Sequence, residues 1–102
     1  MTTVTLDGRK MTTRQAAHAY IQSRLSLPAY YGRNLDALWD MLSTWSEPLR
    51  IRLVHIEAIH VHLNGYARSL IQVFRDAALE NPRLTVDIDS RPPRLLGRLP
   101  DL

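Results

Sequence analysis

Apolar and polar residues alternate in three short segments of the chain, and this two-residue period is typical of β-strands with one buried face. The segments are residues 2–6, 49–54 and 84–89, with apolar positions Val4, Leu6, Leu49, Ile51, Leu53, Leu84, Val86 and Ile88. The middle segment also contains Arg50 and Arg52. These arginines indicate either a sheet face open to solvent or arginine stems lying over a helix.

Between these segments, apolar residues recur at three- and four-residue spacing, which predicts amphipathic helices. Helices are predicted over residues 13–25, 35–43, 55–64 and 66–80. Thr12 and Gln15 fit a capping box at the start of the first helix, and Asn34 is the predicted N-cap of the second. The Asn64-Gly65 pair is predicted to end the third helix.

Strands separated by helices predict an α/β fold with a three-stranded, mainly parallel sheet packed with about four helices. A chain of 102 residues suits one small domain. The domain is predicted to span residues 1–90, because the last alternating segment ends at Asp89. Residues 91–102 combine prolines with arginines, so this basic segment is predicted to be an extended or disordered tail.

Residues 27–45, LPAYYGRNLDALWDMLSTW, combine the features of a presented surface. A rigid turn at Pro28 precedes two tyrosines and a helix with two chemically different faces. The apolar stripe of this helix consists of Leu35, Leu38, Trp39 and Leu42. Asp36 and Asp40 lie four residues apart on one flank, where like charges repel, and only Asp36 is near the helix N-terminus. Stability alone gives no reason for this pair, so we interpret the flank as a binding surface.

The same residues resemble the central segment of the barstar family, the intracellular inhibitors of the bacterial ribonuclease barnase. QVFRDA at residues 72–77 resembles the last helix of that family, and the order of elements agrees from residue 2 to residue 89. The resemblance implies a barstar-like fold and a ribonuclease inhibitor or nuclease-toxin immunity protein that is not an enzyme. It also implies that the acidic helix and the turn before it fill the active site of a basic nuclease.

The resemblance further implies a set of partner-binding residues, in which Asp40 matches the aspartate that dominates binding. The others are Tyr30, Asn34, Leu35, Asp36, Trp39, Ser43, Thr44 and Trp45. As ordinary aromatic residues, Tyr31 and Trp39 are expected to be buried, whereas Tyr30 and Trp45 flank the acidic helix as interface anchors. Asp76 and Glu80, again four residues apart, either extend the negative face or only solvate their helix.

The chain departs from the family pattern at several positions. Arg33 places a positive charge immediately before the acidic helix, Thr44 stands where the family commonly has glycine, and Asp76 is shorter than glutamate. The formal net charge is +3, whereas the best-known inhibitors of the family are acidic. These differences concern the identity of the partner. A ribonuclease with a different rim around its active site, or a toxin nuclease of another type, is compatible with these residues.

The positive charge raises a second hypothesis, a small nucleic-acid-binding module that acts in regulation. The 13 lysine and arginine residues are spread through the whole chain, as is usual for a solvated surface. Residues 28–47 instead have a negative net charge, with one arginine and three carboxylates. We therefore favour a protein partner, a secreted ribonuclease or toxin nuclease bound one to one, and no specific nucleic acid. The free chain is expected to be a monomer.

Catalytic and metal-binding hypotheses fit the residues less well. Asp36 and Asp40 on one exposed flank do not converge across a cleft, as a general acid–base pair requires. His55, His60 and His62 suggest a metal-dependent hydrolase as a third hypothesis, but only one carboxylate, Glu57, lies in that stretch. No cofactor and no metal site are expected.

The remaining features concern the compartment. No window reaches the roughly 18 apolar residues of a membrane span, and residues 1–10 lack the apolar core of a secretory signal. The expected location is therefore the cytoplasm. The absence of cysteine excludes disulfides and thiol chemistry and agrees with a reducing compartment.

Overall fold

The computed structural model describes residues 1–89, which form four α-helices, a short 3-10 helix and three strands. In chain order the elements are β1 (Thr2–Asp7), η1 (Gly8–Lys10), α1 (Arg14–Leu25), α2 (Leu35–Ser43), β2 (Leu49–Val54), α3 (Ile56–Leu63), α4 (Gly65–Glu80) and β3 (Leu84–Ile88). Every predicted helix and strand is confirmed in type and order. The predicted tail, residues 91–102, lies outside the described residues.

The three strands form one parallel sheet in the order β1-β2-β3. Val4 pairs with Ile51, and Ile51 pairs with Val86, so the apolar residues of all three strands share one face. Helices connect each strand to the next, because parallel neighbours need a crossover and cannot be joined by a tight turn. The predicted α/β fold is therefore confirmed, and both strand pairs are parallel.

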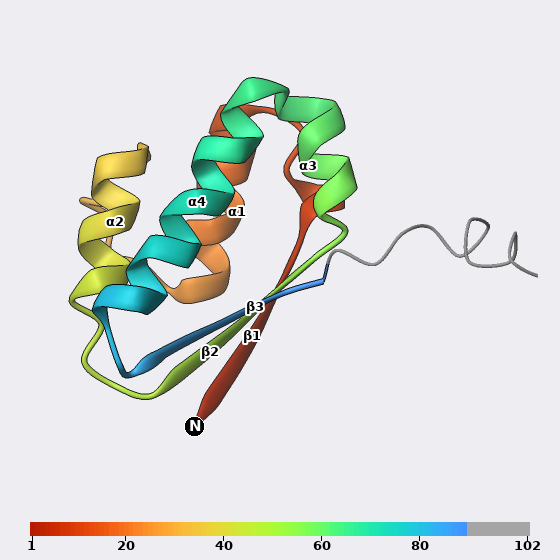
Figure 1. Cartoon of the computed structure of the whole chain (residues 1–102). Helices are drawn as coiled ribbons and strands as arrows, with labels where there is room; N and C mark the ends of the chain where they lie inside the picture. The colour runs from red at the N-terminus through yellow and green to blue at the C-terminus, as the bar shows by residue number, and fades with distance from the viewer. Residues whose placement is uncertain (90–102) are drawn as a thin grey trace, which may run out of the picture.

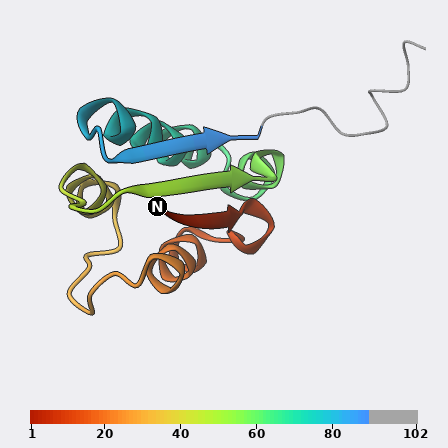
Figure 2. The same cartoon turned by 90° about the horizontal axis from the view of Figure 1, so that it is seen from below.

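The molecule has two layers, because all four α-helices lie on the same side of the sheet (Figures 1 and 2). The hydrophobic core fills the space between the layers. Its fully buried members include Leu6 and Ile51 from the sheet, Ile21 from α1, Leu38 from α2 and Phe74 from α4. The alternation along the strands thus places one apolar face against the apolar stripes of the helices.

No helix of residues 1–89 covers the opposite face of the sheet (Figure 2). Arg50 and Arg52 alternate with the buried Leu49, Ile51 and Leu53, so they lie on this face, and both are exposed. This decides between the two interpretations of these arginines. Arg50 Nε donates a hydrogen bond to Asp87 Oδ2 on the neighbouring strand at 2.6 Å. An ion pair as exposed as this one contributes only about 0–1 kcal/mol to stability.

Two helix boundaries differ from the sequence prediction. The N-cap of α1 is Thr13, whose Oγ1 accepts a hydrogen bond from the Ala16 amide at 3.0 Å. The capping box predicted from Thr12 is therefore wrong by one residue, because two adjacent threonines offer the same chemistry. Between α3 and α4, Asn64 follows the end of α3, as predicted, with a φ of 52° and a ψ of −127°, and α4 begins at Gly65, one residue before its predicted start.

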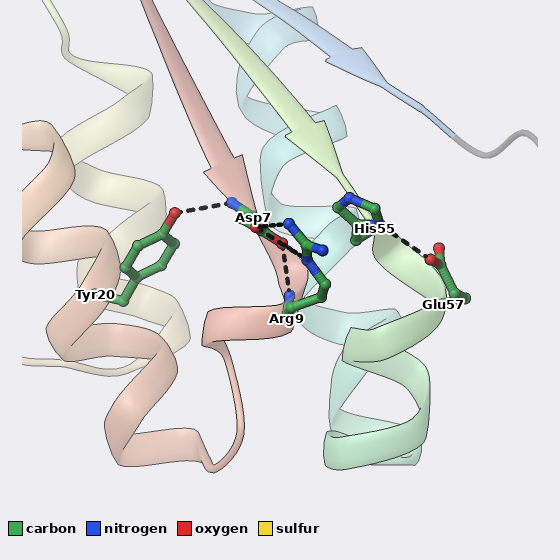
Figure 3. A network of polar contacts seen from close by, with 5 residues as sticks. All are labelled: Asp7, Arg9, Tyr20, His55 and Glu57. Carbon is green, nitrogen blue, oxygen red and sulfur yellow. Dashed lines mark hydrogen bonds and ion pairs between the residues drawn. The ribbon is translucent and has the colours of Figure 1, made fainter.

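A polar network fixes the turn at the carboxyl end of β1 (Figure 3). The Asp7 amide donates to Tyr20 Oη at 2.9 Å, and Arg9 donates to the Asp7 carboxylate, with the shortest contact 2.8 Å. The hydrogen bond from Arg9 lowers the pKa of the Asp7 carboxyl. Gly8 lies so close to α3 that a Cβ there would stand 2.2 Å from the His55 carbonyl oxygen. This network lies near α3, at the far end of the helical layer from α2 (Figure 1).

Candidate functional site

Helix α2 lies at one end of the helical layer and packs beside α4 (Figure 1). Leu38 and Leu42 are fully buried and anchor one side of the helix in the core. Asn34 is its N-cap, as predicted: Asn34 Oδ1 accepts a hydrogen bond from the Ala37 amide at 2.8 Å. Leu35 is only half-buried, so the apolar stripe reaches the surface at the start of the helix.

Asp36 and Asp40 lie on the solvent side of α2, and both are exposed. The ion pairs within residues 1–89 involve other carboxylates, those of Asp7, Glu57 and Asp87. The helix therefore holds two unpaired negative charges one turn apart, on a backbone that is fixed by a cap and a buried face. This is the charged flank that the sequence predicts.

The aromatic residues around α2 divide as expected, with one difference. Tyr30 is 82% exposed, whereas Tyr31 is only 4% exposed, so the prediction that Tyr31 is buried is confirmed. Trp39 is half-buried instead of fully buried, because it packs on the edge of the core. Trp45 is also half-buried. Trp39 and Trp45 are thus only partly enclosed by the core.

The carboxyl ends of α2 and α4 are joined by Asn81, a buried residue that the sequence indicates only as the end of the helix before Pro82. Asn81 Nδ2 donates hydrogen bonds to the carbonyl oxygens of Leu42, at 3.0 Å, and Trp45, at 2.9 Å. This contact brings the end of α4, with Glu80, to the end of α2. A signal was present in the sequence, since asparagine before proline commonly ends a helix, but its long-range partners are not encoded locally.

The remaining predicted residues lie near these two ends. Ser43 is half-buried, and Thr44, Asp76 and Glu80 are exposed. Thr44 Oγ1 donates to the Asp40 carbonyl oxygen at 2.6 Å, so it caps the last turn of α2. Asp76 Oδ1 accepts a hydrogen bond from Gln72 Nε2 at 2.8 Å along α4. Whether any of these residues contacts a partner stays a prediction.

His18 forms a buried link behind the segment that precedes α2, and the sequence prediction missed it. His18 is 1% exposed, and its two ring nitrogens lie 2.7 Å from the hydroxyls of Tyr31 and Tyr66. In the neutral imidazole one nitrogen donates and the other accepts, so both contacts can be hydrogen bonds. Burial, and secondarily the charge of Arg33, lowers the pKa of His18 below its ordinary value. The link ties α1 and α4 to the segment before α2.

A signal for His18 exists in retrospect. His18, Ile21 and Leu25 follow helical spacing, so a histidine occupies a core position of α1. A buried histidine needs polar partners, and the tyrosines supply them. Their separation in the sequence, 13 and 48 residues from His18, is the reason that local reasoning did not find the link.

A hollow lies between the beginning of α1, the beginning of α2 and Tyr66. We call it the arginine hollow, and its lining includes Arg14, Gln15, His18, Arg33, Asp36 and Tyr66. Arg14 lies over the ring of Tyr66, with its guanidinium carbon 4.4 Å from the ring centroid. Arg33 Nε donates a hydrogen bond to Gln22 Oε1 at 2.9 Å. The hollow adjoins the acidic flank, since Asp36 belongs to both.

The histidines after β2 do not form a metal site in the described part of the chain. Within residues 1–89 no group of three or more His, Cys, Asp or Glu side chains is arranged to hold an ion. His55 Nδ1 lies 3.4 Å from Glu57 Oε1, whereas His60 and His62 are exposed. In the same range no helix has the length and apolar character that crossing a bilayer requires.

Comparison with known proteins identifies the family. A family model described as "Barstar (barnase inhibitor)" matches residues 1–89. The chain belongs to the barstar family. A relative from Bacillus subtilis (strain 168), named "Putative ribonuclease inhibitor YrdF", is 37% identical over 81 residues, which cover 78% of this chain and 89% of the relative.

Membership of the barstar family confirms the resemblance found in residues 27–45 and 72–77. The family is described as inhibitors of barnase and the relative is named a putative ribonuclease inhibitor, so both support a role as a ribonuclease inhibitor. The match ends at residue 89, one residue after the end of β3.

Proposed function

We propose that this protein binds a basic ribonuclease or nuclease toxin one to one and blocks its active site with α2 and residues 28–34. The observation that supports this proposal is the exposed, unpaired pair Asp36 and Asp40 on a helix whose other side is buried. A helix that is already fixed loses little conformational entropy when it binds, which favours affinity.

The chemistry of the flank suits an active site that evolved to bind RNA phosphates. Carboxylates accept charge-assisted hydrogen bonds from arginine and lysine, and these are roughly twice as strong as neutral hydrogen bonds. Tyr30, with 82% of its surface exposed, adds a large amphipathic ring beside the charges. Asn34, Leu35, Trp39, Ser43, Thr44 and Trp45 complete the proposed contact surface, with Asp76 and Glu80 at its border.

The proposed biological role is protection of the cell that makes the nuclease. The chain acts in the cytoplasm as a monomer until it meets a nuclease that is destined for secretion or has entered from outside. It needs no cofactor, because inhibition depends only on occupying the site. Complementary charges steer the encounter, so association is expected to slow as the salt concentration rises.

Inhibition of RNA hydrolysis tests the proposal. The purified chain is mixed with a secreted guanyl-specific ribonuclease or a toxin nuclease from the same source, and residual hydrolysis is followed as the ratio changes. We expect activity to disappear at equimolar inhibitor, with calorimetry giving one site per nuclease. RNA degradation by the chain alone, at a rate that follows its concentration through purification, would overturn the assignment as a non-enzyme.

A further inference from the structure

The arginine hollow contains two guanidinium groups that residues 1–89 leave without a carboxylate partner. The ion pairs in this part of the chain belong to Arg9, Arg50 and His55, and none involves Arg14 or Arg33. Both groups are nevertheless held in place, Arg14 by the ring of Tyr66 and Arg33 by the side chain of Gln22. Arg33 uses only Nε for its hydrogen bond, so its two terminal amino groups remain available as donors.

The backbone of Arg33 supports a role for its side chain. Arg33 has a φ of 53°, in the left-handed region that costs a non-glycine residue of this kind about 1 kcal/mol or more. Glycine would adopt this conformation freely, yet the neighbouring Gly32 does not occupy it. Gly32 instead permits close approach, since a Cβ there would lie 3.2 Å from Asn34 Nδ2. The chain thus keeps an arginine where glycine would relieve strain.

The position of the hollow restricts what can bind there. Asp36 lines one side of it, and Asp40 follows one turn along α2. A nucleic acid strand on the two arginines would bring further phosphates beside these carboxylates, and like charges repel. A single carboxylate on a protein partner avoids that repulsion and matches the planar, forked geometry of a guanidinium.

From this geometry we infer that the arginine hollow receives an acidic side chain, Asp or Glu, of the nuclease that α2 inhibits. The inference rests on the proposed function and adds a requirement to it: beside its basic active site, the nuclease carries a carboxylate. Opposite charges side by side on one surface permit only one docking orientation, so Arg14 and Arg33 determine which nuclease the chain accepts.

Single variants test the hollow against the nuclease that the unmodified chain inhibits. Arg33→Glu is expected to weaken binding by about tenfold or more, and Arg33→Gly to weaken it less, because Arg33→Gly removes the guanidinium and its hydrogen bond to Gln22 without adding a negative charge. Arg33→Gly also relieves the left-handed backbone, so its melting temperature should equal or exceed that of the parent. Weak binding by a more stable protein cannot be attributed to misfolding. Arg14→Ala should weaken binding in the same direction.

Arg52→Glu is the matched control, since Arg52 is exposed on the open face of the sheet, on the other side of the molecule from the helices. It should bind as the parent does. Asp40→Ala is measured in parallel to separate the two proposals. If Asp40→Ala weakens binding and the Arg14 and Arg33 variants do not, this inference is wrong and the proposed function stands. If none of them weakens binding, both fail.

Double-mutant cycles identify the acidic residue directly. Each surface Asp or Glu of the nuclease near its active site is replaced by Ala and combined with Arg33→Ala. In one such nuclease variant, Arg33→Ala should no longer lower the affinity appreciably. The coupling between the two substitutions should be about tenfold in affinity. Additive effects at every position would refute the inference. Loss of RNA binding in Arg33→Glu, with no coupling to the nuclease, would do the same and indicate a nucleic acid ligand.

Discussion

At the scale of single residues, Asp36 and Asp40 are alike in chemistry and exposure but differ in place. Asp36 is in the first turn of α2, near the hollow, whereas Asp40 lies mid-helix between the hollow and Thr44. A central contact is desolvated more completely than one at the rim, and hot spots cluster at the centre of interfaces. The two residues are therefore expected to contribute unequally.

Asp40→Ala should lower affinity for the nuclease by several kcal/mol, on the order of the largest single-residue truncations, because it leaves buried cations of the partner unpaired. Asp36→Ala should cost less. Free-state stability should be unchanged or slightly higher in both, since each removes half of a repulsive pair. Calorimetric titration and urea unfolding measure the two quantities. Binding by Asp40→Ala within about 1 kcal/mol of the parent would show that the flank is not the inhibitory surface.

His18 predicts a pH dependence of stability. Its pKa in the folded state is lowered, so near pH 6 the unfolded chain binds more protons than the folded one. Stability is then full above the unfolded pKa of about 6.5 and falls as the pH drops from there through the folded pKa. Arg14, Arg33 and Asp36 line the same hollow as His18.

Replacing His18 by Gln tests this dependence, because glutamine cannot titrate. His18→Gln should lose about 1–3 kcal/mol at pH 7 through weaker bonds to Tyr31 and Tyr66. Between pH 7 and pH 5 its unfolding free energy should fall less than that of the parent. Equal slopes for the two proteins in urea unfolding would mean that His18 does not titrate as described. The exposed histidines His60 and His62 are present in both the parent and the variant, so their contribution cancels when the two unfolding free energies are subtracted.

At the scale of elements, the start of α1 distinguishes two adjacent threonines. Thr13 Oγ1 satisfies the Ala16 amide, and Thr12 lies outside the helix. Thr13→Ala should therefore destabilise the fold by about 1 kcal/mol, the usual contribution of an N-cap side chain. Thr12→Ala is the matched control and should stay within about 0.5 kcal/mol of the parent, as most surface substitutions do. Chemical unfolding that ranks the two variants in the opposite order would restore the cap to Thr12.

At the scale of the whole molecule, the family match and the sheet both end before the last thirteen residues of the sequence. Removal of residues 91–102 should leave the unfolding free energy within about 0.5 kcal/mol of the full chain. The truncation should also reduce non-specific RNA binding, because it removes three arginines. The slope of log affinity against log salt concentration should therefore become less steep. Loss of folding on truncation would show that the domain extends beyond residue 90.

The sequence determined the elements, because strand and helix periods are local: every predicted helix and strand was found. It also determined the acidic flank of α2 and, through the motif in residues 27–45, the family. The sequence does not fix a helix boundary where neighbours share the same chemistry, as Thr12 and Thr13 do. Each of these features depends on residues only a few positions apart, so it is encoded locally in the sequence.

Tertiary structure alone decided the features that join distant segments. The open face beneath Arg50 and Arg52 depends on which side of the sheet the helices cover. The link from His18 to Tyr31 and Tyr66 and the two hydrogen bonds of Asn81 each join segments that no local pattern connects. The physical reason is that a buried polar group must find a partner, but the fold brings that partner from anywhere in the chain.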